Sequence, residues 1–476
     1  MLYPTLLFTA LALFLKWIFT PPAKLRHLPR VSFFRVLWSY ANKETEEARI
    51  RKLYIPFMQE KGEGVAISYA LGRWLIHILD PKIWRTVADD AANWPKELPP
   101  SDMVFFRFVG TKNVVFSNGE TWQKHSTVVH AALKRTLPIE QFTVLTQKLF
   151  KRMGDGGLIK WDHWTMRVAL DAVGTTILGY DFEAVENDNS PFLKQYTTIM
   201  DALSIPLFLV FPIFDVWFPR KDLINNIDAL IARFQAILDY KRENRGNDML
   251  TYMLEEPSLT EEEYRHNMAA FFVAGHDSTA AALSTLVAYL AIYPAFQERA
   301  RKEVIHALDN KDPDSHNLAN MQFLYACVLE ALRINTPFPF TAPRVSPTGA
   351  TLHGSNGKSY YIPPNTSTVL SIASLHRNEN NWSDAHTFNP ERHLDTLTGK
   401  TKIDATIWVP FSRGPRQCPA RNFAMYEMRT VTALLLQSWE WELPPGSPHA
   451  IAPQNVFSPF GLSSPKDLYI NFTKRG

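Results

Sequence analysis

Cysteine is scarce in this sequence, because only two of its 476 residues, Cys327 and Cys418, are cysteines. Two cysteines can form one bridge at most, which excludes a small secreted scaffold held together by disulfides. A charge excess is also lacking, since 50 basic residues stand against 47 acidic ones and no long run of like charge occurs. We therefore do not expect the chain to bind nucleic acid.

Nucleotide-binding loops and metal-binding pairs are absent as well. The glycine-rich stretch at residues 154–157 is not followed by Gly-Lys-Ser/Thr, so we interpret it as a turn rather than a phosphate loop. His376 and His386 are too far apart to form a metal-binding pair on one helix. What the chain does contain is 46% hydrophobic residues, enough for a full globular core.

The amino terminus predicts a membrane anchor. Residues 2–15 carry no charge, Lys16 can extend to the membrane surface, and Pro21 and Pro22 stop a helix. Basic residues follow the apolar run instead of preceding it, and no small-residue cleavage site is present, so an anchor is favoured over a signal peptide. We expect an anchor at residues 1–20, a proline-rich spacer at 21–30 and one domain at 31–476, facing the cytosol.

The body of the chain is predicted to be mainly α-helical with small β-sheets. Residues 161–179 and 223–242 show apolar side chains at helical spacing. Strand-like segments are short and come late in the chain, at residues 360–362, 368–372 and 467–472. Residues 205–214 are apolar but contain two prolines, so they either dip into a membrane or pack internally.

One helix is expected to be much longer than the others. Thr260 and Glu263 form a capping box, and the helical pattern continues to Tyr293 without proline. Such a helix is about 50 Å long, and its apolar middle indicates that it is buried. Gly275 and Asp277 break that pattern side by side, because glycine weakens a helix and a buried carboxylate is costly. Such a break often marks a functional site.

The second unusual segment is residues 411–420, which read Phe-Ser-Arg-Gly-Pro-Arg-Gln-Cys-Pro-Ala before a predicted helix. Backbone amides and the helix dipole at a helix start favour a thiolate, and Arg416 adds positive charge beside Cys418. A thiolate held in this way is suited to be an axial ligand of haem iron. Cys327 lacks this setting and is interpreted as a small buried hydrophobic residue.

This segment resembles the haem-binding loop of the cytochrome P-450 superfamily, Phe-x-x-Gly-x-Arg-x-Cys-x-Gly. Phe411, Gly414, Arg416 and Cys418 match it, and Ala420 replaces the final glycine. The resemblance, which extends from Trp122 to the carboxyl terminus, implies that haem b lies between the long central helix and the helix after the cysteine loop. It also implies that Cys418 ligates the iron.

Three further motifs of that family occur before the cysteine loop, in the order that the family has them. Glu330 and Arg333 resemble its Glu-x-x-Arg helix motif, and Arg392 lies in a Pro-Glu-Arg segment; the resemblance implies that these three are structural. Residues 274–279 resemble the oxygen-activating segment, which implies a proton relay through Asp277, Ser278 and Thr279. The first hydroxyl of this segment is usually a threonine, which Ser278 replaces here.

The third motif, at residues 119–126, resembles the helix whose tryptophan and a following basic residue meet a haem propionate. Trp122 matches, but Ser126 stands where an arginine is usual. His125 or Lys124 could compensate. By their motif positions, the resemblance implies Arg344 and Arg416 as further candidate propionate partners.

The resemblance implies a microsomal-type, membrane-anchored monooxygenase that inserts one oxygen atom from O2 into an apolar substrate. NADPH-derived electrons are expected from a separate flavoprotein reductase, because only 58 residues follow Cys418, and the endoplasmic reticulum is the expected location.

The aromatic residues of three segments are expected to line the substrate pocket, namely Phe105, Phe106, Phe108, Phe338, Phe340, Phe457 and Phe460. A reductase-docking face and a solvated charged face explain Arg413, Arg421, Lys134 and Arg135 equally well. The divergent motifs favour a fungal enzyme of secondary metabolism, acting for example on a terpenoid or polyketide.

Three alternatives remain open from the sequence. A haem-thiolate isomerase or dehydratase would need no O2, although retention of Asp277 and Ser278 argues against it. A haem sensor or carrier would not need the acid–hydroxyl pair or the aromatic segments. A membrane-anchored structural protein with an inert Cys418 would require the ordered motifs to agree by chance.

Overall fold

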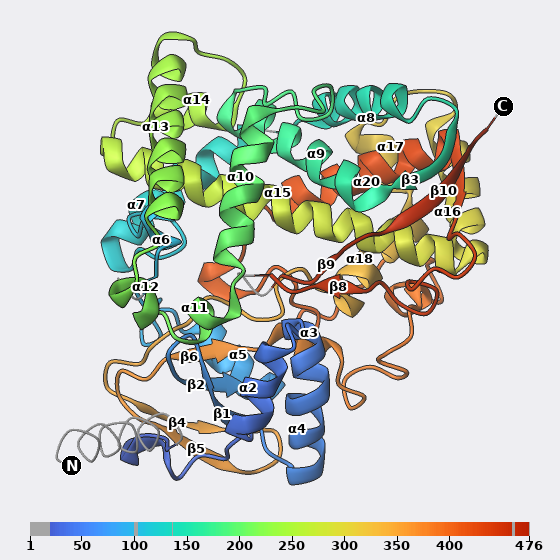
Figure 1. The fold of residues 1–476 in the computed structure, drawn as a ribbon. Helices are drawn as coiled ribbons and strands as arrows, with labels where there is room; N and C mark the ends of the chain where they lie inside the picture. Colours follow the sequence, from blue (N-terminus) through green and yellow to red (C-terminus); the bar gives the residue numbers. More distant parts are fainter. Residues whose placement is uncertain (1–19, 100–102, 136, 459–461, 476) are drawn as a thin grey trace, which may run out of the picture.

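The computed structural model describes residues 20–99, 103–135, 137–458 and 462–475, and most of the fold is helical (Figure 1). The longer helices are α2 (Phe33–Ala41), α5 (Pro81–Asp89), α7 (Gly119–Arg135), α8 (Ile139–Met153), α9 (Trp161–Val173), α10 (Pro191–Leu203), α13 (Lys221–Glu243), α15 (Glu261–Ile292), α16 (Pro294–Leu308), α18 (Gln322–Ile334) and α20 (Arg421–Ser438). The shorter helices are α3 (Glu46–Arg49), α4 (Ile55–Lys61), α6 (Phe106–Val109), α11 (Pro206–Val210), α12 (Ile213–Trp217), α14 (Met249–Leu254), α17 (Ser315–Asn320) and α19 (Ile372–His376). Helical turns occur at η1 (Ala23–Leu25), η2 (Ile50–Tyr54), η3 (Gly174–Leu178), η4 (Pro390–His393) and η5 (Gly414–Arg416).

Small sheets complete the fold, in agreement with the predicted class. In the first sheet, β2 (Arg73–Ile78) pairs antiparallel with β1 (Val65–Ala70) and parallel with β6 (Thr368–Leu370). In the second, β10 (Tyr469–Lys474) lies between β3 (Gly156–Lys160) and β7 (Trp439–Glu442). Two antiparallel pairs remain, one formed by β4 (Ala350–His353) with β5 (Ser359–Ile362) and one by β8 (Asn455–Val456) with β9 (Ser464–Pro465).

The strand predictions were only partly right. We expected strands late in the chain, but β1 and β2 come early and were missed. Every residue of β1 is buried, so the apolar–polar alternation that marks a half-exposed strand is absent. The segment predicted as a strand at residues 368–372 ends sooner, because the Ser371 hydroxyl accepts a hydrogen bond from the Ser374 N–H and starts α19.

Helix α15 is the long helix that the sequence predicted, and it crosses the centre of the molecule (Figure 1). The Thr260 hydroxyl accepts from the Glu263 N–H, and the Glu263 carboxylate accepts from the Thr260 N–H at 2.8 Å, so the capping box is formed. Its middle is buried nearly all round, as its apolar composition requires. The helices predicted at residues 161–179 and 223–242 are also confirmed as α9 with η3 and as α13.

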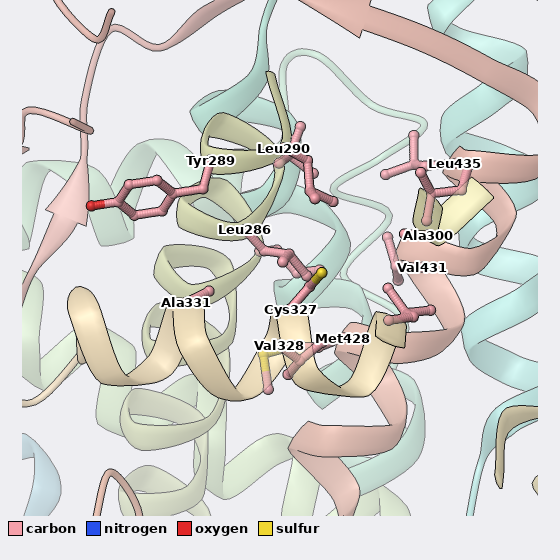
Figure 2. Close-up of a cluster of buried hydrophobic side chains, with 14 of the residues drawn as sticks. Leu286, Tyr289, Leu290, Ala300, Cys327, Val328, Ala331, Met428, Val431 and Leu435 are labelled. Atoms are coloured by element: carbon pink, nitrogen blue, oxygen red, sulfur yellow. The ribbon is translucent and has the colours of Figure 1, made fainter. Parts of the chain in front are cut away.

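Cys327 occupies the hydrophobic core, as predicted. Figure 2 shows its thiol among Leu286 and Leu290 of α15 and Val431 of α20. It is completely buried on α18, and burial raises the pKa of its thiol well above the ordinary value. The side chain therefore contributes to packing and stays protonated.

The predicted anchor at residues 1–20 lies, apart from its last residue, outside the residues that the structure describes. Within the described part, no single helix has the length and apolar composition needed to cross a membrane. Helices α15 and α16 meet that test only as a pair, with a bend of 110° between them. Because α15 is mostly buried, it is a core helix of the domain.

Residues 205–214 form α11 and the start of α12, two short helices joined near Pro212. They are not packed internally throughout, because Ile205, Leu207 and Ile213 are exposed. Val216 and Trp217, which follow in α12, are about half exposed. Helix α11 packs against α2. Two aromatic side chains of α2, Phe34 and Trp38, are exposed. Helix α11 also contacts α12. We refer to the exposed apolar side chains of these neighbouring segments, Phe34, Trp38, Leu207, Val216, Trp217 and Phe218, as the exposed apolar face.

Candidate functional site

A cavity of about 360 Å³ lies between α15 and the loop that precedes α20. Ala274, Gly275, Ser278 and Thr279 line it from α15, and Cys418 lines it from the loop. The sequence-predicted residues Phe411, Arg416 and Trp122 also line it. The structure therefore brings together the segments that the sequence singled out, although they lie 140 residues apart along the chain (418 − 278).

The cysteine loop is held by its own backbone and by helix α5. The Cys418 N–H donates to the Phe411 carbonyl at 2.9 Å, which closes the loop just before α20. Gly414 has a φ of 71°, and a Cβ at this position would lie 2.7 Å from the Ala88 carbonyl oxygen. Only glycine allows both the left-handed conformation and this close approach.

The Cys418 thiol sits where a thiolate can be stabilised. It lies at the start of α20, with the Ala420 N–H and the Arg421 guanidinium nearby. Burial raises the pKa of this thiol, and the hydrogen bond from the Ala420 N–H and the charge of Arg421 oppose that shift. These two groups favour the anion, and a bound cation would favour it further.

Two cations that line the cavity, Lys96 and Arg416, lie close to a third, Arg344, which does not itself line it. Among the described residues, none of the three forms an ion pair with a carboxylate. Arg344 is completely buried, and its Nη1 donates to the carbonyls of Val87 at 3.0 Å and Ala88 at 3.4 Å. Its Nε and Nη2 have no hydrogen-bond partner among the described residues. Lys96, which the sequence did not point to, lines the cavity, and its Nζ donates to the Ala342 carbonyl at 3.1 Å.

Arg416 completes this cationic cluster, which consists of Lys96, Arg344 and Arg416. Its guanidinium lies 4.3 Å from the ring centroid of Trp122 and donates to the Ser117 carbonyl at 2.6 Å. Burial, then the charge of Arg344, lowers the pKa of Arg416 to about 10. Burial also lowers the pKa of Arg344 to about 10, and that of Lys96 well below its ordinary value. The cluster is therefore a site that favours an anion.

The two residues expected to compensate for Ser126 serve another purpose. Lys124 pairs with Glu263 at 2.7 Å, and the His125 Nδ1 lies 2.8 Å from the Asn267 amide nitrogen. Both contacts join α7 to the first turns of α15, and neither side chain lines the cavity. Ser126 itself does line it. The expected compensation by His125 or Lys124 is therefore wrong for this conformation, whereas Lys96 supplies a cation from another segment.

The acid of the predicted relay does not line the cavity. The Asp277 carboxylate accepts a hydrogen bond from the Tyr196 hydroxyl of α10 at 2.9 Å, and its other oxygen lies 3.2 Å from the His276 Nε2. Burial, then the charge of Asp277, holds the pKa of Tyr196 well above its ordinary value, so this hydroxyl remains a donor. No sequence motif pointed to Tyr196.

The two hydroxyls beside Asp277 both face the cavity. Ser278 Oγ donates to the Ala274 carbonyl at 2.6 Å, and Thr279 Oγ1 donates to the Gly275 carbonyl at 2.9 Å. Gly275 lines the cavity, and packing also requires a glycine at this position. An added Cβ would lie 2.9 Å from Val173 Cγ2 on α9. The glycine therefore allows α9 and α15 to pack closely.

Glu330, Arg333 and Arg392 lie away from the cavity and form a buried ion network. Arg333 donates to both Glu330 oxygens, at 2.7 and 2.8 Å, and Arg392 Nε donates at 3.0 Å. His393, which was not predicted, adds a contact from Nε2 at 3.0 Å. Burial raises the pKa of Glu330, but the hydrogen bonds from Arg333 and His393 outweigh it, so that the value is about 2.

The aromatic residues expected in the pocket divide into two groups. Phe338 and Phe340 line the cavity, together with Val115, Phe271 and Ile372. Phe105, Phe106 and Phe108 instead pack in or against the core around α13 and α15, and Phe457 contacts Tyr40. These four are wrong as pocket residues, because their segments face neighbouring helices. Phe460 lies outside the described residues.

The family assignment follows from comparison with known proteins. The cytochrome P-450 family model matches residues 39–470. The chain belongs to the cytochrome P-450 family. It is 29% identical over 360 residues to the cytochrome P-450 monooxygenase cpaH of Aspergillus oryzae, covering 72% of this chain and 68% of that one. It is 26% identical over 490 residues to cytochrome P-450 72A397 of Kalopanax septemlobus, covering 92% and 91%.

A solved structure supports the cytochrome P-450 fold. The haem domain of a mutant cytochrome P-450 superposes with a TM-score of 0.76 at 20% identity, covering 89% of this chain and 93% of that one. The predicted family and fold class are thus confirmed. As a member of this family the protein is an oxidoreductase, and the fold implies a haem iron.

We predict that Gly414→Ala distorts the cysteine loop of this cytochrome P-450. The left-handed conformation costs a non-glycine residue about 1–2 kcal/mol, and the contact with the Ala88 carbonyl adds about 1–3 kcal/mol of overpacking. Gly446→Ala is the matched control, because Gly446 has a φ of 75° but open space around it. Thermal unfolding and haem content should fall more for Gly414→Ala; equal losses in both variants would contradict the role of close approach.

Proposed function

We propose that this protein is a haem-thiolate monooxygenase with haem b as its cofactor and Cys418 as the axial ligand of the iron. The observation that carries the proposal is the presence, on one cavity, of the Cys418 thiol at a helix start and of Lys96 and Arg416, with the partly unpaired guanidinium of Arg344 close to them. A thiol beside α15 could be structural, but such a cluster requires an anionic ligand to offset its burial.

The residues present fit a haem. Its two propionates are carboxylates, and Arg344 has two buried N–H groups without a partner in the described chain. Lys96 and Arg416 line the cavity beside it, where charge-assisted hydrogen bonds would satisfy both sides. Small residues at Ala274, Gly275 and Ala420 leave room for a flat ring. We assign Lys96, Arg344 and Arg416 to the propionates and Trp122 to the wall beside them.

Ligated through Cys418, haem supplies the activation of O2 and the insertion of one oxygen atom. The protein's own part is to hold and protect the site. Phe411 and Gly414 shape the loop, and Ala420 and Arg421 favour the thiolate. Ser278 and Thr279 would accept and pass protons at the cavity wall, with Asp277 as the acid behind them.

The substrate is proposed to be an uncharged apolar small molecule. Val115, Phe271, Phe338, Phe340 and Ile372 line the cavity, and its described lining contains no carboxylate. A terpenoid or polyketide from secondary metabolism has this chemistry. Such a compound should displace water from the site and shift the haem absorption band, whereas organic acids should not.

Electrons are proposed to come from NADPH through a separate flavoprotein reductase. Two of the four basic residues considered for docking are already engaged, since Arg413 binds Asp89 at 2.9 Å and Arg135 pairs with Glu255. Lys134 and Arg421 remain as candidates. Reductase-supported NADPH oxidation that persists after both are changed to methionine would rule these candidates out.

We further propose that residues 1–20 anchor the protein in the endoplasmic reticulum membrane, residues 21–30 form a spacer, and residues 31–476 are one catalytic domain in the cytosol. The exposed apolar face defined above supports contact of that domain with lipid, since exposed apolar patches mark interaction surfaces. Tryptophan and phenylalanine are suited to the membrane interface.

The first test is the carbon monoxide difference spectrum of the reduced protein. A strongly red-shifted band typical of thiolate-ligated haem is expected. Cys418→Ala should abolish that band, whereas the matched control Cys327→Ala should keep it, because Cys327 lies in the core away from the cavity. A band typical of histidine-ligated haem in the unmodified protein, or no haem at all, would contradict the proposal.

Ser278→Ala should bind haem normally but lose coupling. A positioned proton donor contributes about 10²–10⁴-fold, so product formed per NADPH should fall by about tenfold or more, with peroxide released instead. Ser284→Ala is the control on the same helix, because its hydroxyl bonds Thr165 and does not face the cavity. Unchanged coupling in Ser278→Ala would move the role to Thr279.

Membrane contact can be measured by fluorescence quenching in vesicles of brominated phosphatidylcholine. Trp38→Ser/Trp217→Ser should reduce the quenched fraction, because both indoles are more than half exposed on the apolar face. Trp164→Ser, which changes a tryptophan that packs near Arg152 and Arg167 outside this face, should leave it unchanged. Equal quenching in all three proteins would exclude insertion of this face.

A further inference from the structure

Asn118 connects two of the three cations of the cationic cluster. It lies immediately before α7, and its Oδ1 accepts hydrogen bonds from the Lys96 N–H at 2.9 Å and from Arg416 Nη2 at 2.7 Å. Its Nδ2 donates to the Lys96 carbonyl at 2.8 Å. One amide therefore binds the main chain of Lys96 on both sides and the guanidinium of Arg416.

Holding Lys96 and Arg416 close together has an electrostatic cost. Burial, then the charges of Arg344 and Arg416, holds the pKa of Lys96 well below its ordinary value. Like charges in a buried site repel, so Lys96 and Arg416 would separate if nothing fixed their segments. They come from residues 320 positions apart in the chain (416 − 96), so no local structure holds them together.

The Asn118 side chain is not explained by capping of α7. A capping side chain accepts from backbone N–H groups of the helix that it precedes. Here the described partners of the Asn118 side chain are Lys96, Arg416 and the Phe116 carbonyl, none of which belongs to α7. Its orientation is therefore directed at the cationic cluster.

We propose that Asn118 is a positioning residue that holds Lys96 and Arg416 in place for the two haem propionates. This inference rests on the proposed function, because it assumes that haem is the anion bound there. An amide suits the task because it binds both partners without adding charge. A carboxylate at this position would pair with Arg416 and cancel part of the attraction for the propionates.

The experiment measures haem release from the full-length ferric holoprotein into excess apomyoglobin. Asn118→Ala should release haem about tenfold faster, as expected for the loss of a hydrogen bond to a charged group. Asn118→Asp keeps the size of the side chain and adds a negative charge. It should also release haem faster and shift the midpoint potential to a more negative value. Asn244→Asp adds the same charge at an exposed position and should behave like the unmodified protein.

A double-mutant cycle separates positioning from a general structural role. If Asn118 acts through Lys96, the effects of Asn118→Ala and Lys96→Met on haem release are less than additive. Additive effects, or unchanged release from Asn118→Ala, would overturn the inference. If Asn118→Ala fails to fold, Asn118→Asp decides, and haem release at the unmodified rate would overturn it. Absence of haem from the unmodified protein would instead refute the proposed function itself.

Discussion

The cysteine loop depends on one buried ion network that lies outside the cavity. Glu330 and Arg333 of α18 are completely buried, and Arg333 Nη1 donates to the His376 carbonyl at 2.6 Å. His376 Nε2 in turn accepts from the Val409 N–H at 2.9 Å, two residues before the loop begins. Removal of one charge from such a network leaves the other buried and unpaired, which costs about 3–5 kcal/mol. The position of Cys418 therefore depends on side chains that do not touch the cavity.

A second constraint is the separation of charges around the cavity. Positive charge is concentrated in the cationic cluster, where Asn118 and backbone carbonyls accept from some of the donors without neutralising the charges. The only carboxylate of residues 274–279, Asp277, accepts from Tyr196 and does not line the cavity. If Asp277 entered the cavity in this conformation, it would compete with an anionic ligand for the cations. The arrangement thus preserves an acid close to the site without weakening the cluster.

Features that depend on a local pattern could be predicted from the sequence. Features that depend on contacts between distant segments were predicted wrongly or were missed. The capping box at Thr260, the loop around Cys418 and the Glu330 network have fixed spacings, so they could be predicted. Strand β1 could not, because it is buried on both faces and shows no alternation. Phe105 and Phe108 face helices instead of the cavity, and the sequence does not give that direction. Lys96, Asn118 and Tyr196 acquire their partners only through the tertiary fold.

The replacement of threonine by Ser278 has a structural consequence that the sequence did not reveal. Ser278 and Thr279 both donate their hydroxyl protons to carbonyls one turn earlier on α15. Each oxygen can therefore accept a hydrogen bond from a group in the cavity, while its own proton is donated to a carbonyl. Ser278 is the more exposed of the two, and Thr279 is buried with 4% of its surface exposed. Because a serine hydroxyl has more rotational freedom than a threonine hydroxyl, its bond to the Ala274 carbonyl is what keeps this oxygen facing the cavity.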